Sequence, residues 1–205
     1  LVPVGGFTSG MYRNVDIVIP DGAICSALPP EGVVFAYGES TNAMLLAILQ
    51  AMADAVGENA VAGDTGSPNL HTAHGLHPDG SLWLSIGVAG GERGPWGATR
   101  AGDADSFSIF YQANSIDTAI EVSEADAPVV ILRREYVTDS AGPGYHRGGA
   151  AVLKDSGFLA PAAHNLIVLR YKQPTGKGVR GGGDGALGGV WLWPGREDGR
   201  CEPPD

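Results

Sequence analysis

Apolar and polar positions repeat with two different periods along this chain, and the longer period indicates a helix. Between Asn42 and Val56 an apolar residue recurs at every fourth position, which is the spacing of one helix face. The stripe consists of Met44, Ile48, Met52 and Val56, widened by Leu45 and Leu49. Ser40 or Thr41 can cap the start, and Gly57 suits the left-handed position that follows a last helical turn. The pattern predicts one long amphipathic helix over residues 42–56.

Shorter apolar runs separated by Gly, Pro, Asp and Ser are typical of β-strands. Two such runs precede the helix, at residues 16–19 and 33–37, and the first ends at a Pro-Asp-Gly turn. The later runs are rich in Val, Ile, Tyr, Phe and Trp, and they cover residues 81–88, 106–113, 129–136, 166–171 and 190–193. Together with the helix, this order predicts an α+β fold with β-rich mixed or antiparallel sheets.

The composition excludes several classes of protein. Glycine supplies 32 of 205 residues without a collagen-like period, and 43% of the chain is hydrophobic, which is enough for a packed core. The formal net charge of −10 disfavours nucleic acid and anionic membrane surfaces as partners. No run of 18 apolar residues predicts a membrane-spanning helix. Cys25 and Cys201 fit a reducing compartment, so we expect a cytoplasmic protein.

The ends of the sequence lack anchoring elements. Leu1 starts a segment without the basic and apolar regions of a signal peptide, and residues 203–205 follow a polar run that has no helix or strand. We therefore expect residues 1–205 to form one domain that is a part of a larger fold.

Glycine motifs for nucleotides are present in form but not in context. Residues 176–181 and 183–188 both match G-x-G-x-x-G, and a dinucleotide site needs a strand before this motif and a helix after it. Another glycine run and the strand-like segment 190–193 follow instead. A P-loop is also excluded, because Gly178 stands where Ser or Thr would bind magnesium. The sequence therefore predicts no nucleotide site.

Three of the five histidines, His71, His74 and His77, follow one another at intervals of three. Imidazoles at this spacing can meet a metal if the backbone curls suitably, with Asp64 and Asp79 completing the ligand shell. The alternative is a polar histidine cluster in a loop, which we favour because glycine and proline interrupt the segment. We therefore predict no metal site, and we take His71 and His74 as candidates for acid–base catalysis.

Trp96 lies between glycines in the segment 94–100. In one interpretation its side chain fills the core beneath a tight turn. In the other interpretation the ring forms a wall of a ligand pocket, as aromatic side chains often do. On the second interpretation, Trp96 is a candidate substrate-binding residue.

A further glycine-rich segment, residues 139–149, follows the predicted strand 129–136 and carries an acid, a hydroxyl, a histidine and an arginine. Arg147 keeps its charge, so its burial requires a carboxylate, carbonyl or phosphate partner. In the first interpretation, which we favour, Arg147 pairs with Asp139 and fixes the turn. In the second, Arg147 and His146 face a pocket and hold an anionic substrate. His146 is accordingly a catalytic candidate, and Arg147 is a substrate-binding candidate.

Four ordered segments together resemble one known family. Residues 139–149 are similar to the signature D-S-G-G-x-G-x-x-R-G-G, with departures at Ala141 and Pro143. Residues 94–98 are similar to the turn G-G-x-W-G-A, again with a proline in place of a glycine. The other two matches are residues 5–20, similar to N-x-G-x-x-R and its following strand, and residues 174–186, similar to P-x-G-x-x-G-G-x-x-G-A. On these motifs the chain resembles the hydantoinase B/5-oxoprolinase family.

The resemblance implies that residues 1–205 correspond to the C-terminal segment of a hydantoinase B-type subunit. In this family an ATP-binding hydantoinase A-type subunit activates the substrate, and the B-type subunit then opens a cyclic amide such as 5-oxoproline or a hydantoin. The divalent metal motifs belong to the N-terminal part of the B-type subunit. We therefore expect this chain to bind no cofactor itself. We expect its partners, the A-type subunit and the remaining part of the B-type subunit, to bind ATP with magnesium and the divalent metal.

Two alternatives stay open at this point. Related ketone carboxylases of the acetone or acetophenone type use similar subunits to join an activated enol to CO₂. The chain can also be a non-catalytic structural subunit that holds the ATP-bearing and metal-bearing chains together. In each case we expect the isolated chain to be inactive.

Overall fold

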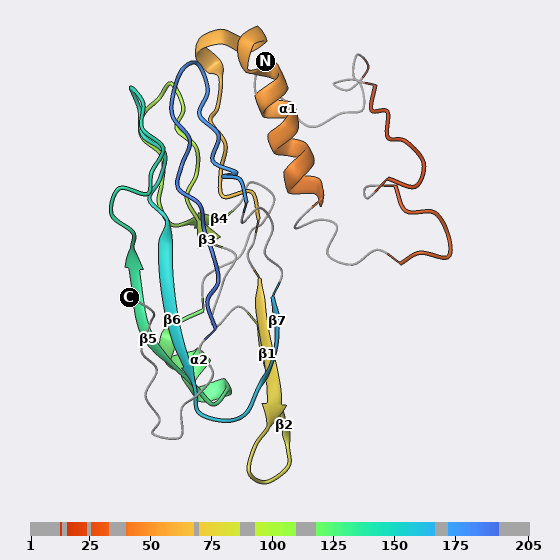
Figure 1. Ribbon diagram of the computed structural model, residues 1–205, viewed down its shortest axis with the longest axis vertical. Helices are drawn as coiled ribbons and strands as arrows, with labels where there is room; N and C mark the ends of the chain where they lie inside the picture. Colours follow the sequence, from red (N-terminus) through yellow and green to blue (C-terminus); the bar gives the residue numbers. More distant parts are fainter. Residues whose placement is uncertain are drawn as a thin grey trace. The chain divides into compact units, whose positions relative to one another are not determined.

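The computed structural model describes residues 13, 16–23, 26–32, 40–67, 70–86, 93–109, 118–166 and 172–192. The chain divides into two compact units, Leu1–Ala36 and Tyr37–Asp205. The assignment of the whole chain to one domain stays a prediction. Among the described residues, the helices and strands belong to the second unit, and Figure 1 shows their order along the chain.

The first unit contains the predicted Pro-Asp-Gly turn. Gly22 has a φ of +73°, and the amide of Ala23 donates a hydrogen bond of 3.2 Å to the carbonyl of Pro20. The strand predicted at residues 16–19 is wrong, because these residues lie outside any strand and Val18 is 87% exposed. Apolar residues alone do not make a strand, since its backbone groups need a neighbouring strand to pair with. The strand predicted at residues 33–37 lies outside the described residues.

The second unit is built from the following elements in chain order: α1 (Ser40–Val56), the 3-10 turn η2 (Gly57–Asn59), β1 (His71–Leu76), β2 (Leu82–Ile86), β3 (Arg93–Gly94), β4 (Ser108–Ile109), α2 (Ile120–Asp126), β5 (Val129–Tyr136), β6 (Val152–Phe158) and β7 (Ala163–Leu166). The strands form a three-stranded sheet in the order β2-β1-β7 and two pairs, β3-β4 and β5-β6. Every pairing of these strands is antiparallel. The α+β class is therefore confirmed.

The long helix α1 is present, but its buried face differs from the prediction. It ends where Gly57 takes a φ of +56°, which is the left-handed conformation expected at that position. The buried side chains of α1 are Asn42, Leu46 and Ala53, whereas Ile48 and Met52 of the predicted stripe are about half exposed. A regular apolar spacing selects a helix, but the packing partners decide which side of it is buried.

The structure also contains a second, short helix, α2, that the sequence analysis did not predict. With seven residues, α2 is too short to show a helical period clearly in the sequence. Tertiary contacts hold it in place, including a hydrogen bond of 2.8 Å from the amide of Ile131 in β5 to the carboxylate of Glu124.

The strand predictions succeeded where an apolar run pairs along its whole length. The run 129–136 is confirmed as β5, and the run 81–88 contains β2. Residues 108–109 of the run 106–113 form β4, while its residues 110–113 lie outside the described part. β7 begins at Ala163, earlier than the predicted 166–171, and residues 167–171 are likewise outside the described part.

In the second unit the sequence analysis missed three strands, the two-residue β3 and the longer β1 and β6, and one strand that it predicted there is wrong. Residues 190–192 form no strand. β1 was interpreted as a loop because of Gly75, but this glycine pairs with Trp83 of β2 and leaves room for the indole ring against its backbone. β6 is rich in polar residues, and it forms a strand because β5 offers a partner, with Asp155 placed 2.7 Å from Arg133.

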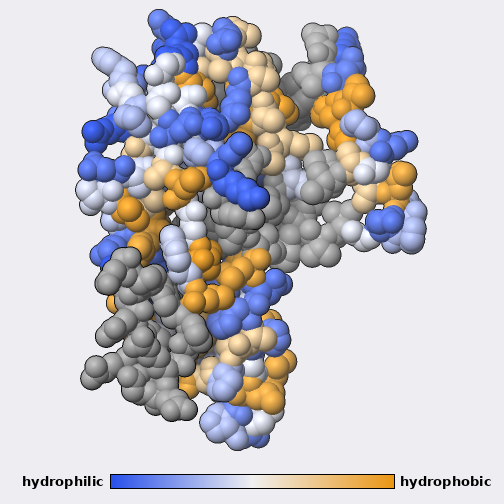
Figure 2. Space-filling view, in the orientation of Figure 1, coloured by the Kyte–Doolittle hydropathy of each residue, from blue (hydrophilic) through white to orange (hydrophobic). Residues whose placement is uncertain are grey.

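The core lies between the β2-β1-β7 sheet and the β5-β6 pair. It consists of Ala73, Trp83, Ala127 and Val129, with Ile131, Phe158 and Ala162 packed against it. The rings of Trp83 and Phe158 stack across the interface with centroids 6.5 Å apart. The outer face of the β1-β2 hairpin is also apolar, and Leu82 on this face is 71% exposed. Hydrophobic surface is visible in the lower part of Figure 2. No helix in the described part of the chain is long and apolar enough to cross a membrane.

Candidate functional site

Four loop segments of the second unit meet backbone to backbone, and we call them the glycine cluster: residues 62–66, 94–98, 140–149 and 174–186. The amide of Thr65 donates to the carbonyl of Pro95 over 2.9 Å, and the amide of Gly149 donates to the carbonyl of Trp96 over 3.0 Å. A third bond joins the amide of Ala186 to the carbonyl of Ser140 over 2.9 Å. Three motifs that lie far apart in the sequence are thus neighbours in space.

Glycine is required in this cluster because the backbones leave no room for side chains. A Cβ atom at Gly97 would overlap the carbonyl group of Ala62, and one at Gly149 would overlap the carbonyl group of Asp105. Both obstacles are backbone atoms, which cannot rotate away as a flexible side chain can. These positions of the cluster therefore exclude any residue larger than glycine.

Ser140 closes the loop that connects β5 to β6. Its hydroxyl donates to the carbonyl of Val137 over 2.7 Å and accepts a hydrogen bond of 2.7 Å from the amide of Ala151. The side chain is buried, with 6% exposed. Both hydrogen bonds are to the backbone, so this hydroxyl holds the loop in place rather than facing a ligand.

The segment 174–186 is closed by Asp184. Its carboxylate accepts a hydrogen bond of 2.6 Å from the ammonium group of Lys177 and one of 3.0 Å from the amide of Gly178. These contacts hold the pKa of Asp184 below its usual value, with Lys177 as the main cause. Within the described residues, no helix follows either G-x-G-x-x-G match.

Asp64 is a buried acid at the base of the glycine cluster. Its side chain is 1% exposed, and one carboxylate oxygen accepts a hydrogen bond of 2.7 Å from the amide of Gly66. Among the described residues, the other oxygen, Oδ2, has no hydrogen-bond partner, and neither has the amide of the buried Asn42 nearby. Burial raises the pKa of Asp64 to about 6, although the hydrogen bond from Gly66 and the proximity of Asn42 oppose this rise.

The three histidines at intervals of three do not share a site. His71 is buried on the inner face of β1, while His74 is exposed on the opposite face because residues three apart on a strand point to different sides. His77 follows the strand, where its carbonyl accepts from the amide of Gly80. Asp79 accepts hydrogen bonds from Ser81, the nearer of 2.6 Å. The loop interpretation of His71 and His74 is therefore wrong.

His164 on β7 was missed by the sequence analysis and is the partner of His71. Its Nδ1 atom lies 2.9 Å from Nε2 of His71. In the register of β1 and β7, Ala73 pairs with His164. This register brings the two histidine rings together, although the residues lie far apart in the sequence. Because the two positions are 93 residues apart, no local motif could have indicated this pair.

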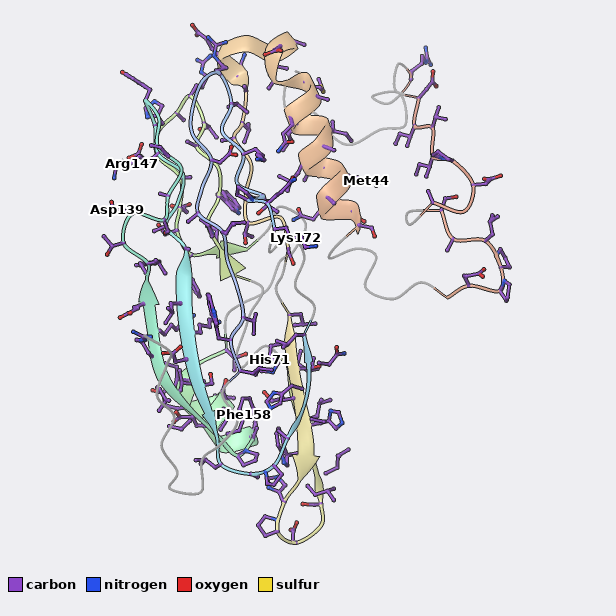
Figure 3. All side chains as sticks on the ribbon, viewed as in Figure 1. Met44, His71, Asp139, Arg147, Phe158 and Lys172 are labelled. Atoms are coloured by element: carbon purple, nitrogen blue, oxygen red, sulfur yellow. The ribbon has the colours of Figure 1, made fainter. Side chains whose placement is uncertain are left out.

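The loop 139–149 is held by Asp103, which the sequence analysis did not single out. One carboxylate oxygen of Asp103 accepts a hydrogen bond of 2.8 Å from the amide of Arg147 and lies 3.6 Å from Nδ1 of His146. Within the described residues, no hydrogen bond or ion pair joins Asp139 to Arg147, so the interpretation of an internal ion pair is wrong. Figure 3 shows Asp139 and Arg147 on the loop above β5 and β6, and both side chains are exposed.

A broad cavity of about 1780 Å³ connects the glycine cluster with the histidine pair. Trp96, His146 and Asp64 line it from the cluster, and His71 and His164 line it from the sheet. Among the sequence-predicted residues in the described part, His74 and Arg147 lie outside this lining. The catalytic and substrate-binding roles themselves stay predictions.

No group of three or more His, Cys, Asp or Glu side chains in the described ranges is arranged to hold a metal ion. Two neighbouring sets of donors are the imidazoles of His71 and His164 and the carboxylate of Asp64 with the amide of Asn42. Each set offers only two side chains. The arrangement is suited to hydrogen bonding and proton transfer.

Comparison with known proteins identifies the class to which this fold and site belong. The model of the hydantoinase B/oxoprolinase family matches residues 2–203, which is nearly the whole chain. The chain therefore belongs to the hydantoinase B/oxoprolinase family, and the resemblance inferred from the motifs is confirmed. Proteins of this family are parts of hydantoinase- and oxoprolinase-type enzymes.

Two curated relatives match the chain at 26% identity. One, from Pseudomonas sp. (strain NS671), is named as a B-type subunit of a D-/L-hydantoinase and is matched over 90% of this chain. The other is the uncharacterized protein MJ0963 of Methanocaldococcus jannaschii, matched over 87% of this chain. The match covers 30% of the length of each relative.

Among solved structures, a nucleotide-free structure of acetone carboxylase is similar to part of this chain. The similarity has a TM-score of 0.45 at 20% identity, and it covers 58% of this chain and 16% of the other.

Proposed function

We propose that this chain supplies one wall of the active-site cavity of an ATP-dependent enzyme complex that opens cyclic amides such as hydantoins or 5-oxoproline. The observation that carries the proposal is the position of the family motifs: segments 94–98, 140–149 and 174–186 meet at one cavity in a chain of the hydantoinase B/oxoprolinase family. Motifs with a purely local structural role would have no reason to converge there.

The surface of the glycine cluster supports a role in binding amides. Glycines of segments 94–98, 140–149 and 174–186 line the cavity, so backbone is accessible there without a covering side chain. A cyclic amide offers one N–H donor and one C=O acceptor in a fixed cis arrangement, which peptide groups can match. In this proposal the indole ring of Trp96 packs against the substrate ring, and His146 lies beside it at the same wall.

The size of the cavity supports a site that further protein completes. At about 1780 Å³ it exceeds the volume of roughly 300–1,000 Å³ that is typical of small-molecule sites. The chain spans 30% of its curated relatives, so the remaining part of a B-type subunit is our first candidate for the missing walls. ATP with magnesium belongs in this proposal to a hydantoinase A-type subunit, and a divalent metal belongs to the remaining B-type part.

The test is the activity of the assembled complex of this chain with an A-type subunit and the remainder of the B-type subunit. Ring opening of hydantoin and 5-oxoproline is measured with and without Mg-ATP. The proposal predicts ATP-dependent turnover that falls at least tenfold in Trp96→Leu, a loss of about 1.4 kcal/mol or more in transition-state stabilisation. Turnover only of acetone with bicarbonate would assign the ketone carboxylase alternative instead.

A structural role is tested in the same complex. If the other chains turn over cyclic amides equally well without this chain, the cavity takes no part in the reaction. A Trp96→Leu complex that assembles normally and keeps full activity would also contradict the proposal. Leu82→Ser, on the exposed outer face of β2, is a matched control for the loss of an apolar side chain outside the cavity.

A further inference from the structure

A hydrogen bond joins two imidazole rings at the sheet end of the cavity. Nε2 of His71 on β1 lies 2.9 Å from Nδ1 of His164 on β7, and the ring centroids are 5.1 Å apart. The ring of Phe158 on β6 contacts both imidazoles edge to face, with centroids 5.9 Å from His71 and 4.6 Å from His164. Figure 3 shows His71 and Phe158 beside each other between β6 and β1. The pair is therefore held by all three strands.

The two rings differ in their access to water. His71 is 5% exposed, whereas His164 is an exposed residue at the edge of the sheet. Burial, and secondly the charge of His164, lower the pKa of His71 from 6.5 to about 4. Among the described residues, no carboxylate contributes to this shift. When the pair takes up a proton, burial therefore disfavours the charge on the ring of His71.

When the pair carries a proton, this difference in burial determines which ring donates the hydrogen bond. A protonated His164 carries N–H groups on both nitrogens, so Nδ1–H must donate to the unprotonated Nε2 of His71. The proton on Nε2 of His164 is the one that exchanges with the cavity, because Nδ1–H is retained in the bond to His71. Loss of that proton leaves a lone pair on Nε2.

We propose that His164 is a general base of this site, with His71 as the positioning residue that holds it in the tautomer with Nδ1 protonated and Nε2 free. This assignment rests on the proposed function for its reaction. The assignment goes beyond the proposed function, because it names a catalytic residue that none of the sequence motifs contains. His71 serves as a neutral acceptor here, in the place where an acid–histidine dyad would have a carboxylate.

The proton transfers of ring opening balance within this pair. A water oxygen bonds to the carbonyl carbon of the cyclic amide, and a proton of that water moves to Nε2 of His164. The C–N bond of the ring then breaks, its electron pair remains on nitrogen, and Nε2 returns the proton to that nitrogen. Water and the cyclic amide are the only reactants of these proton transfers, and His164 ends in its starting state. Where the partner subunit has phosphorylated the carbonyl oxygen, the same transfers give an acyl phosphate, which a second water hydrolyses to the acid and phosphate.

The tautomer can be tested on the chain without any substrate. Ring-nitrogen chemical shifts of ¹⁵N-histidine-labelled protein distinguish protonated from unprotonated nitrogens at pH 7.5. We expect His164 to be protonated at Nδ1 and unprotonated at Nε2, while the exposed His74 shows the ordinary preference for a protonated Nε2. A His164 protonated at Nε2 and free at Nδ1 would overturn the proposal.

Two variants of the positioning residue sharpen this test. His71→Phe keeps a ring against Phe158 but removes the acceptor, so His164 should return to the same tautomer as His74. His71→Gln keeps an acceptor oxygen and should retain the Nδ1–H tautomer. An unchanged tautomer in His71→Phe would overturn the role of His71. Should that variant not fold, the shifts of the wild-type chain still decide the direction of the bond.

Activity of the complex then tests the catalytic role separately. His164→Gln should lower kcat at least tenfold with little change in KM, and His77→Gln, at a histidine outside the lining of the cavity, should leave both constants unchanged. Full activity of His164→Gln in a complex that opens cyclic amides would overturn the general base and leave the proposed function intact. Absence of turnover in the wild-type complex would instead remove the proposed function, and the catalytic role of His164 with it, whatever the nitrogen shifts show.

Discussion

Replacing Asp64 by asparagine should stabilise the chain above about pH 6 and leave its stability unchanged below about pH 4. Burial raises the pKa of Asp64 from 3.8 to about 6, so the native state binds this proton more tightly than the unfolded chain does. The stability that this group contributes is therefore fully present below pH 3.8 and is lost as the pH rises through about 6. At about 1.36 kcal/mol for each tenfold change in proton affinity, the loss amounts to about 3 kcal/mol.

An asparagine fits the hydrogen bonds around this position. Its Oδ1 atom can keep the bond from the amide of Gly66, which is 2.7 Å long in the native chain. Its Nδ2 group takes the place of Oδ2 of Asp64, which has no hydrogen-bond partner within the described residues. The variant therefore removes a buried charge from a site that disfavours it. At pH 7.5 we expect a gain in the free energy of unfolding of up to about 3 kcal/mol.

His71 shifts stability in the opposite direction over the same pH range. Its pKa is lowered from 6.5 to about 4, so its contribution is present above pH 6.5 and is lost as the pH falls through about 4. Between pH 4 and 6 the effects of Asp64 and His71 therefore oppose each other, and the wild-type curve should be shallow. In Asp64→Asn the opposing effect of Asp64 is removed, so stability should rise with pH across this window.

The measurement is urea unfolding followed by tryptophan fluorescence at intervals from pH 4 to 8. Asp79→Asn is the matched control, because Asp79 is exposed and its pKa is lowered by its hydrogen bonds with Ser81. This control should not gain stability at pH 7.5. An Asp64→Asn variant that is less stable than the wild type at pH 7.5 would refute the reasoning, since it would show that the ionised carboxylate is favoured in the native state.

Three further predictions concern the glycine cluster and its loops, and each is checked by the same unfolding measurement. Gly97→Ala should destabilise the chain by several kcal/mol or prevent folding, because the new Cβ overlaps the carbonyl group of Ala62. Gly188→Ala is the control, because open space surrounds Gly188, and it should lower the free energy of unfolding by about 1 kcal/mol or less. Ser140→Ala should cost about 1–3 kcal/mol through two lost backbone hydrogen bonds, and an unchanged stability would show that water replaces the hydroxyl. Arg147→Ala should change stability by less than about 0.5 kcal/mol, because its side chain is exposed. A larger loss would reveal a structural ion pair. A loss of turnover at unchanged stability would support substrate binding by Arg147.

Local features of the sequence determined the elements whose cause is itself local. The period of α1, the glycine that ends it and the uninterrupted run of β5 are short-range properties, and each was predicted near its observed bounds. The glycine motifs were informative for a different reason. Close backbone contacts tolerate only glycine, so the requirement appears in the sequence as fixed positions, and these positions were enough to indicate the family before any fold was known.

Only the tertiary structure decided which side chains share a site. Whether His71 lies on a strand or in a loop depended on the pairing of β1 with β2 and β7, because glycine at position 75 disfavours a strand until Trp83 packs over it. The partners His71 and His164 come from strands that are distant in sequence, and the burial that lowers the pKa of His71 arises from β6 packed across them. Burial and proximity are properties of the assembled sheets, so no pattern along the chain could contain them.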